Sequence, residues 1–192
     1  MADTAIDTVD YTNMTLFDLM ERVSELDPSA TVALEARMAP GSPKHISAKS
    51  LARGAQGGNV DDMLSLALCC HRGLLGVTAN LDTAISWYQN AADRGNSRAQ
   101  FCLAIFSLFE AGTPEEDERA ISLIRESAAQ DYYQAHFFLG LGFLQGLFGL
   151  PKKPRRALKH FFVTLKLRPD FRAIFEDKMT ALYLDEKARL PS

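Results

Sequence analysis

The sequence predicts an all-α fold in which antiparallel helical hairpins stack into a solenoid. The first observation is a repeat, because similar stretches open at Gly58, Gly95 and Asp131, at intervals of 37 and then 36 residues. The second observation is a small residue at one position inside each stretch: Ala67, Ala104 and Gly140. Periods of this length are typical of stacked helical hairpins. Small side chains at matching positions let neighbouring helices approach closely.

The second half of each unit follows the same period. Each begins with an alanine: Ala84, Ala120 and Ala157. The pair Ala91-Ala92 recurs as Ala128-Ala129 and decays to Thr164-Leu165 in the third unit. Chance similarity among amphipathic helices would have to reproduce several small-residue positions in one register, so the pattern favours a true repeat.

The chain begins with an N-terminal extension, residues 1–43, that is predicted to hold one or two helices. Apolar residues at helical spacing follow Asn13 as far as Leu26, and a short helix is expected after Asp27-Pro28 to about Met38. A break rich in proline and glycine then precedes a partial repeat at 44–57.

Three full repeats are expected next, at about 58–94, 95–130 and 131–167, which makes 44–167 the repeat region. Arg168-Pro169-Asp170 ends the last repeat. Residues 168–192 are predicted to form a capping helix, with apolar residues on one face and charged residues opposite. A solenoid needs such a cap to cover its exposed apolar end.

Local signals set the expected helix ends. Residues that can cap the first helices precede them: Asn59, Asn96 and Asp131. Asn80 or Asp82 starts one second helix, and Thr113 starts the next, followed by Pro114 at the first helical position. Glycines are expected to end helices at Gly73, Gly112 and Gly146, and at Gly95.

Composition excludes several classes of protein. The chain has 192 residues, 47% hydrophobic and 23% charged, which is too apolar for disorder. Its net charge of −3 gives no bulk attraction to nucleic acid or anionic membranes, so we expect neither as a partner. No secretory signal or transmembrane run is visible, and the three cysteines have no favourable mutual pairing, which together predict a cytoplasmic protein.

These units resemble Sel-one-like repeats, the SLR family, which is a tetratricopeptide-like class of helical repeat. Gly73-Leu74-Leu75-Gly76-Val77 resembles the glycine-rich turn of the family, and Trp87-Tyr88 and Ala91-Ala92 match its second helix. Leu139-Gly140 and the glycine-rich turn that begins at Gly146 supply matching elements in the third unit. The resemblance extends from about residue 54 to 167 and implies a right-handed α/α superhelix of helical hairpins. It also implies a role in holding proteins together.

The first helices of such arrays line the concave face, which predicts a protein-binding surface. In this register the inward-facing residues of the three units are Leu64, Leu68, His71 and Arg72, then Arg98, Phe101, Ile105, Leu108 and Phe109, then Phe137, Leu141, Leu144 and Gln145. The stripe is apolar, so a partner protein or amphipathic helix, or the chain's own N-terminal segment, should cover it. A rotated register would instead make these residues ordinary core.

No catalytic, metal or cofactor site is predicted. Adjacent residues on a helix point about 100° apart, so Cys70 and His71 do not face one another as a nucleophile and a base would. The four histidines are scattered without metal-ligand spacing. A basic cluster from Lys152 to Lys159 could contact an acidic partner, although a solvated surface also explains it.

The sequence therefore favours a non-enzymatic scaffold or adaptor that binds another protein through the concave face. One alternative is a bacterial immunity or regulatory protein that captures a specific toxin or effector. An alternative of another class is a small-ligand-binding or hydrolytic repeat protein, for which no site is visible. The partner and the oligomeric state are left open.

Overall fold

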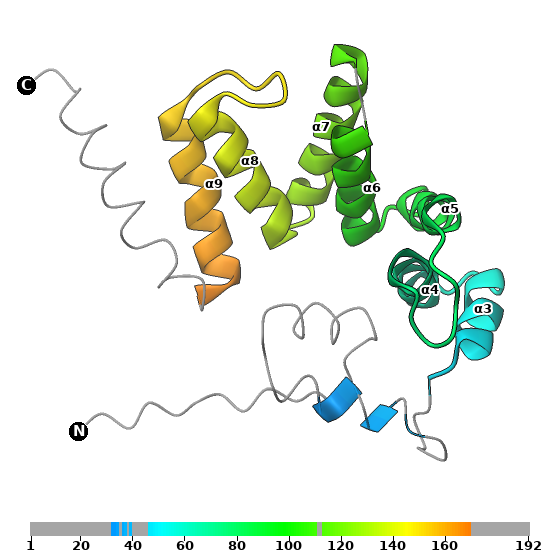
Figure 1. The fold of residues 1–192 in the computed structure, drawn as a ribbon. Helices are drawn as coiled ribbons and strands as arrows, with labels where there is room; N and C mark the ends of the chain where they lie inside the picture. The colour runs from blue at the N-terminus through cyan, green and yellow to red at the C-terminus, as the bar shows by residue number, and fades with distance from the viewer. Residues whose placement is uncertain (1–31, 35, 38, 40–45, 111–112, 170–192) are drawn as a thin grey trace, which may run out of the picture. The chain divides into compact units, whose positions relative to one another are not determined.

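The structure, a computed structural model, describes residues 32–34, 36, 37, 39, 46–110 and 113–169 (Figure 1). Within these ranges every regular element is helical, which confirms the predicted all-α class. The predicted helix after Asn13, the glycine end at Gly112 and the C-terminal capping helix lie outside the described residues. The chain divides into two units, 1–90 and 91–192.

In the first unit, helix α3 (Ala48–Gln56) packs against helix α4 (Val60–Arg72). Ser47 caps α3, and the Asn59 side chain accepts a hydrogen bond from the Asp62 amide at the start of α4. The helices approach closely at Gly54, where an added methyl group would collide with the Asp62 side chain. Ala67 is fully buried in α4, as its recurring small side chain predicts.

Helix α5 (Leu81–Ala92) follows a short loop that returns the chain after α4. Its cap is Asn80, whose side chain accepts a hydrogen bond from the Thr83 amide at 2.8 Å, so the first of the two predicted candidates is the cap. The Asn80 amide in turn donates to the Cys70 carbonyl at 2.7 Å. Ala84 and Tyr88 are almost completely buried on the inner side of α5.

The second unit contains two hairpins. Helix α6 (Ser97–Glu110) packs against α7 (Pro114–Ala129), and α8 (Tyr133–Gln145) packs against α9 (Pro154–Leu167); α7 also contacts α8 (Figure 1). The core of this unit is made from small, aliphatic and aromatic residues of all four helices, including Ala104, Ile124 and Phe161. Gly140 is buried, and an added methyl group there would collide with the Phe161 ring.

The predicted caps of α6 and α7 are confirmed, and that of α8 is wrong. Asn96 accepts from the Ala99 amide, and Thr113 forms a capping box with Glu116 in front of Pro114. Asp131 does not cap α8, because it adopts a left-handed conformation with φ of 58°. It occupies the closing turn as Gly95 does one repeat earlier, and aspartate is among the few residues that tolerate this conformation.

The predicted recurrence of the Ala91-Ala92 pair is displaced by one residue. The Asn96 amide donates to the Ala91 carbonyl, and the equivalent Tyr132 amide donates to the carbonyl of Ser127. The buried pair in α7 is therefore Ser127-Ala128, while Ala129 is exposed. The predicted pair is displaced because Ser127 occupies its first position, and a serine side chain is hardly larger than that of alanine.

A hydroxyl group then recurs where the sequence suggests decay. The Ser127 hydroxyl donates to the Ser97 carbonyl at the start of α6, at 2.6 Å. The Thr164 hydroxyl, fully buried in α9, lies 3.5 Å from the Tyr133 carbonyl at the start of α8. Each bond joins the last turn of the second helix of a hairpin to the first turn of the first helix of the same hairpin. The α8–α9 hairpin therefore keeps this close contact between its two helices, with Thr164 in place of Ser127.

The two predicted glycine-rich turns share one conformation. Gly73 and Gly146 end α4 and α8 in the left-handed region, as predicted. Both turns continue with two more residues of positive φ, Leu75-Gly76 in the first and Phe148-Gly149 in the second. A hydrogen bond across each pair closes a tight turn of the type that requires positive φ at both central residues.

Candidate functional site

The predicted binding residues of the second unit lie along α6 and α8. Phe101 and Ile105 of α6, and Phe137, Leu141 and Leu144 of α8, are half-buried and pack against the core of this unit. Leu108 is part of that core, and only 8% of its surface is exposed. The two first helices thus present one edge of their apolar side chains to the surface and the other to the interior.

Aromatic rings connect these helices. The Phe101 ring lies 5.5 Å from the Tyr132 ring and 6.3 Å from the Phe138 ring, both in edge-on geometry. The Phe137 ring lies 6.1 Å from Phe161 in α9, within its own hairpin. Phe101 and Phe137 therefore each contribute packing, in addition to any part in binding.

Exposure increases toward the C-terminal ends of the first helices. Equivalent positions at these ends hold Arg72, Phe109 and Gln145, and all three side chains are exposed. Phe109 is 77% exposed, the most exposed of the large hydrophobic residues in the described chain. The accessible part of the predicted surface in the second unit lies near this end of α6 and α8.

In the first unit, α4 contributes fewer accessible residues. Leu64 and Leu68 are buried, with 1% and 7% of their surfaces exposed, whereas His71 is exposed. Arg98, at the start of α6 in the second unit, is half-buried. The binding role of the whole predicted set stays a prediction, because burial shows accessibility and not use.

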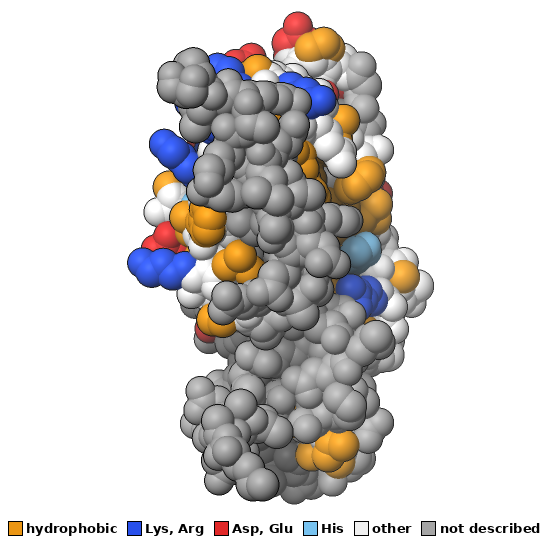
Figure 2. Space-filling model, turned by 90° about the vertical axis from the view of Figure 1, so that its left-hand side faces the viewer, with side chains coloured by type: hydrophobic (Ala, Val, Ile, Leu, Met, Phe, Trp, Pro, Cys, Tyr) orange, Lys and Arg blue, Asp and Glu red, His pale blue; other side chains and the backbone are white. Residues whose placement is uncertain are grey.

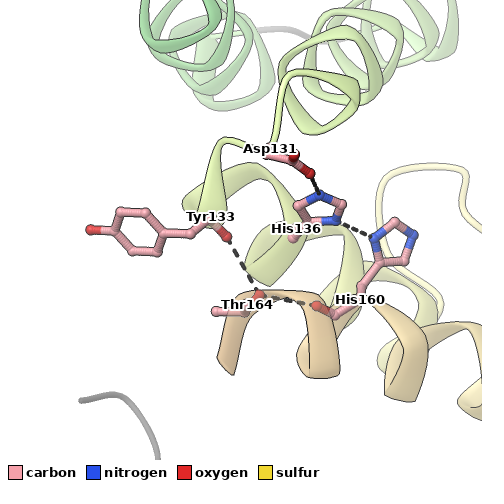
Figure 3. Close-up of polar contacts among 5 residues, drawn as sticks. All are labelled: Asp131, Tyr133, His136, His160 and Thr164. Carbon is pink, nitrogen blue, oxygen red and sulfur yellow. Dashed lines mark hydrogen bonds and ion pairs between the residues drawn. The ribbon is translucent and has the colours of Figure 1, made fainter. Parts of the chain in front are cut away.

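The hairpin of α8 and α9, called the third hairpin below, contains a pair of histidines that was not predicted from the sequence. His136 of α8 and His160 of α9 face one another, with 3.1 Å between their Nδ1 atoms (Figure 3). The other ring nitrogen of His136 lies 3.9 Å from an Asp131 carboxylate oxygen. The His160 ring also stacks on Phe143, at 5.6 Å between centroids. Separated by 24 residues, the two histidines show no helical spacing that would signal the pair.

Their surroundings favour the neutral rings. Burial first, then the proximity of His136 and that of Arg156, together lower the pKa of His160 to about 4. Burial also lowers the pKa of His136, while the Asp131 carboxylate opposes that shift. A neutral pair can share one proton between the Nδ1 atoms, which is a structural contact and needs no ligand.

The cysteines and acids of the described chain show no arrangement for catalysis or metal binding. Burial, and secondarily the adjacent Cys70, raises the pKa of Cys69 to about 11, which disfavours a reactive thiolate. Cys102 is half-buried, and none of the three is in a disulfide. Within the described residues, no group of three or more histidine, cysteine or acidic side chains could hold a metal ion.

A cleft of about 460 Å³ lies beside α7. Its wall on the helix includes Asp117, Glu118 and Arg125, and its opposite wall is the turn at Phe148–Leu150. The cleft was not anticipated from the sequence, because the tight turn of one hairpin approaches the second helix of another only in the folded chain. The wall formed by α7 carries both acidic and basic side chains, so the lining does not favour a ligand of one particular charge.

Paired helices, tight turns of positive φ and small residues at one repeating height define a helical repeat protein. The chain belongs to the Sel1 repeat family, whose model matches residues 60–96, 97–132 and 134–162, more than half of the sequence. The predicted family is thereby confirmed. Proteins of this family are generally scaffolds for protein interaction.

Two solved structures of this family share the fold. The crystal structure of c5321, a protective antigen of uropathogenic Escherichia coli with an SLR fold, aligns with a TM-score of 0.57 and 27% identity over 78% of this chain and 32% of that one. A Sel1 repeat protein from Oxalobacter formigenes aligns with a TM-score of 0.55 and 23% identity, over 68% of this chain and 94% of that one. The fold is therefore the solenoid of helical hairpins that the sequence predicts.

Two relatives with known sequences match parts of the chain. The uncharacterized protein NMB1327 of Neisseria meningitidis is 36% identical over 73 residues, which are 38% of this chain and 15% of that protein. Chitin synthase regulatory factor 3 of Schizosaccharomyces pombe is 27% identical over 117 residues, 58% of this chain and 12% of that protein. The chain thus matches only a small part of either relative's length. Among the described residues, no helix is both long and apolar enough to cross a membrane.

Proposed function

We propose that this chain is a non-enzymatic scaffold or adaptor that holds a partner protein, or an amphipathic helix of one, against the first helices of its repeats. One observation carries the proposal. Residues 99–109 of α6 and the whole of α8 contain no Asp, Glu, Lys or Arg, although many of their side chains reach the surface. A helix without a charged face is ordinarily covered on all sides.

Large apolar side chains are accessible on both helices. The large hydrophobic residues that are half-buried or exposed are Phe101, Ile105, Phe106 and Phe109 on α6, and Phe137, Phe138, Leu141 and Leu144 on α8. Covering such side chains is favourable at roughly 25 cal/mol per Å² of apolar surface removed from water. An amphipathic helix offers an apolar face of suitable width, which supports this class of partner.

The comparisons support a binding role without naming a partner. One relative is called a regulatory factor of chitin synthase, and a scaffold that positions or restrains another protein would suit regulation of that kind. The buried, unpaired thiols of Cys69 and Cys70 favour a reducing compartment such as the cytoplasm. The first inference concerns the kind of process in which the surface would act, and the second concerns the cellular compartment.

The test removes an exposed aromatic side chain from the proposed surface. Phe109→Ser should preserve the fold, because the ring is 77% exposed, whereas changing Phe101 or Phe137 would also remove packing. Leu81→Ser is the matched control, since Leu81 is an exposed apolar residue outside the predicted set. Tagged wild-type and variant chains are used to capture proteins from a lysate of the native host, followed by quantitative mass spectrometry.

We expect at least one host protein to be retained by the wild type and by Leu81→Ser and to be depleted several-fold with Phe109→Ser. Circular dichroism melting curves should be the same for all three chains. If Phe109→Ser retains every protein that the wild type retains, in equal amounts, this end of the first helices is not the binding surface.

A further inference from the structure

The third hairpin differs from the rest of the chain in charge. Between Asp131 and Asp170 the sequence contains no acidic residue, yet it contains seven basic ones: Lys152, Lys153, Arg155, Arg156, Lys159, Lys166 and Arg168. The whole chain carries −3, so the residues outside this hairpin together carry −10. The basic charge is thus concentrated in one hairpin of an otherwise acidic protein.

Most of these cations gather at the start of α9. All five from Lys152 to Lys159 are exposed. Figure 2 shows Lys and Arg side chains near the top of the molecule, at the height at which α9 begins in Figure 1. In the described part of the chain, Lys152, Lys153 and Lys159 form no ion pair with an acid.

Helix stability does not explain this placement. The N-terminus of a helix carries partial positive charge, so cations there are unfavourable. The first turn of α7, one repeat earlier, follows the usual rule, since Glu115 and Glu116 directly follow Pro114 there, whereas Arg155 and Arg156 directly follow Pro154 in α9. Lys153 does not cap α9 with its side chain, and its backbone amide donates to the Phe143 carbonyl at 2.7 Å. The cluster is consequently held on a well-defined turn.

The exposed face of α9 extends the cluster and adds an aromatic residue. Arg155, Lys159, Phe162 and Lys166 follow one another at spacings of four, three and four residues, which places them on one face. All four are exposed, and Phe162 is 59% exposed. A face with cations on both sides of an accessible ring matches a segment that carries acidic residues around an apolar one.

We infer that the start and exposed face of α9 form a docking surface for an acidic peptide segment of a partner protein, with an apolar side chain of that segment against Phe162. Carboxylates of the segment contact the cluster that begins at Lys152. This surface belongs to a second helix and is separate from the apolar edges of α6 and α8. It therefore adds a second contact region and does not depend on the function proposed above.

A short acidic peptide fits better than a nucleic acid or a membrane. The cleft beside α7 places Asp117 and Glu118 opposite the turn at Phe148–Leu150, which leads directly into the cluster. A long polyanion or an anionic membrane that extended past the cluster would meet these carboxylates and the other acids of a chain that is negative overall. A peptide that is confined to α9 avoids them.

The proposal is tested with the full chain and a fluorescein-labelled peptide, EELFEELFEE, by fluorescence anisotropy. The variants are Lys152→Glu/Lys153→Glu and, separately, Phe162→Ser. The matched control is Lys49→Glu/Arg53→Glu, an equal charge reversal at exposed residues of α3. Duplex DNA and vesicles of phosphatidylserine and phosphatidylcholine are titrated in parallel.

We expect the wild type and the α3 control to bind the peptide equally, and binding to weaken as salt is raised. The Lys152→Glu/Lys153→Glu variant should lose about tenfold in affinity or more, because attraction is replaced by repulsion. Phe162→Ser should lose several-fold. The reversed charges suit the helix N-terminus, so an unchanged or raised melting temperature will show that this variant is folded.

Equal binding by the charge-reversed variant and the wild type would overturn the inference. So would tighter binding of DNA or anionic vesicles with the same dependence on Lys152 and Lys153, since the partner would then be of another class. No measurable binding of the peptide by the full chain would also overturn it, as expected if the chain's own residues 170–192 held this face.

Discussion

Replacing Gly140 with alanine tests whether the repeating small residue is required by packing. A β-carbon at this position would lie 3.0 Å from Cζ of Phe161 and still closer to two other ring carbons. The ring itself is only 3% exposed and lies against Phe137. It therefore cannot swing into solvent to make room, and α8 and α9 would have to separate.

Two opposing contributions determine how much Gly140→Ala changes the free energy of unfolding. Alanine is a better helix former than glycine by about 1 kcal/mol in a helix interior. Forcing an extra methyl group into a well-packed core costs roughly 1–3 kcal/mol, and contact with an immobile ring places Gly140 toward the upper end. The net expectation for Gly140→Ala is a loss of about 1–2 kcal/mol, which corresponds to a decrease in melting temperature of about 2–8 °C for a chain of this size.

Gly54→Ala is the matched control, because the same substitution in α3 meets a different neighbour. The methyl group there would contact the Asp62 side chain, which is partly exposed and can rotate away. We expect Gly54→Ala to leave stability unchanged or to raise it by up to about 1 kcal/mol. Urea unfolding followed by circular dichroism measures both variants.

A double-mutant cycle assigns the effect to the ring. Phe161→Leu removes the obstructing ring edge, so its cost should be smaller in the Gly140→Ala background than in the wild type, with a coupling of about 1 kcal/mol. If Gly140→Ala is as stable as Gly54→Ala, or if the cycle shows no coupling, the small residue is not required by the contact between α8 and α9.

Three further results are expected. Ser127→Ala should lose about 1 kcal/mol of unfolding free energy by urea titration, because the hydroxyl donor to Ser97 is removed; an unchanged midpoint would show that this bond contributes nothing. Leu75→Asn should raise the melting temperature, since asparagine tolerates a φ of 54° better than leucine and relief of the left-handed strain is worth about 1 kcal/mol. The folded pKa values of His136 and His160 are both below the usual 6.5, so the unfolded chain binds protons more readily, and stability should be lost as pH falls from about 6.5 toward 4. His160→Gln should flatten that dependence in melting curves recorded across this range, and an identical slope would exclude the pair as its source.

The elements that depend on local chemistry could be predicted from the sequence. Asn59 and Thr113 accept hydrogen bonds from the first turns of their own helices. Gly73 ends α4 in the left-handed backbone region, which favours glycine. Each of these residues acts within a few positions along the chain. The repeat period predicted the fold for a related reason, because residues at the same position in successive repeats occupy equivalent places in the packing between helices.

The features that sequence reasoning missed depend on contacts between distant residues. The buried pair in α7 was misplaced by one residue because a hydrogen bond across the hairpin, from Ser127, takes the place of a methyl contact. The facing histidines, His136 and His160, are brought together only when α8 lies against α9. The binding surface was predicted as a row of residues, but Leu64 and Leu68 are buried because exposure varies along each helix with its local neighbours.

The repeat architecture also explains how the third hairpin can carry an unfavourable cluster of charge. The fold depends on buried positions such as Ala157 and Phe161, which face the core, whereas the residues at the start of each second helix face solvent. Pro154 begins α9 as Pro114 begins α7, and the turn before α9 is held by its own backbone hydrogen bonds. Charge at these starts can therefore differ in sign between neighbouring repeats without changing the stack. A sign that opposes the helix dipole, as at Lys153, then points to a requirement outside the fold, and an acidic partner meets that requirement.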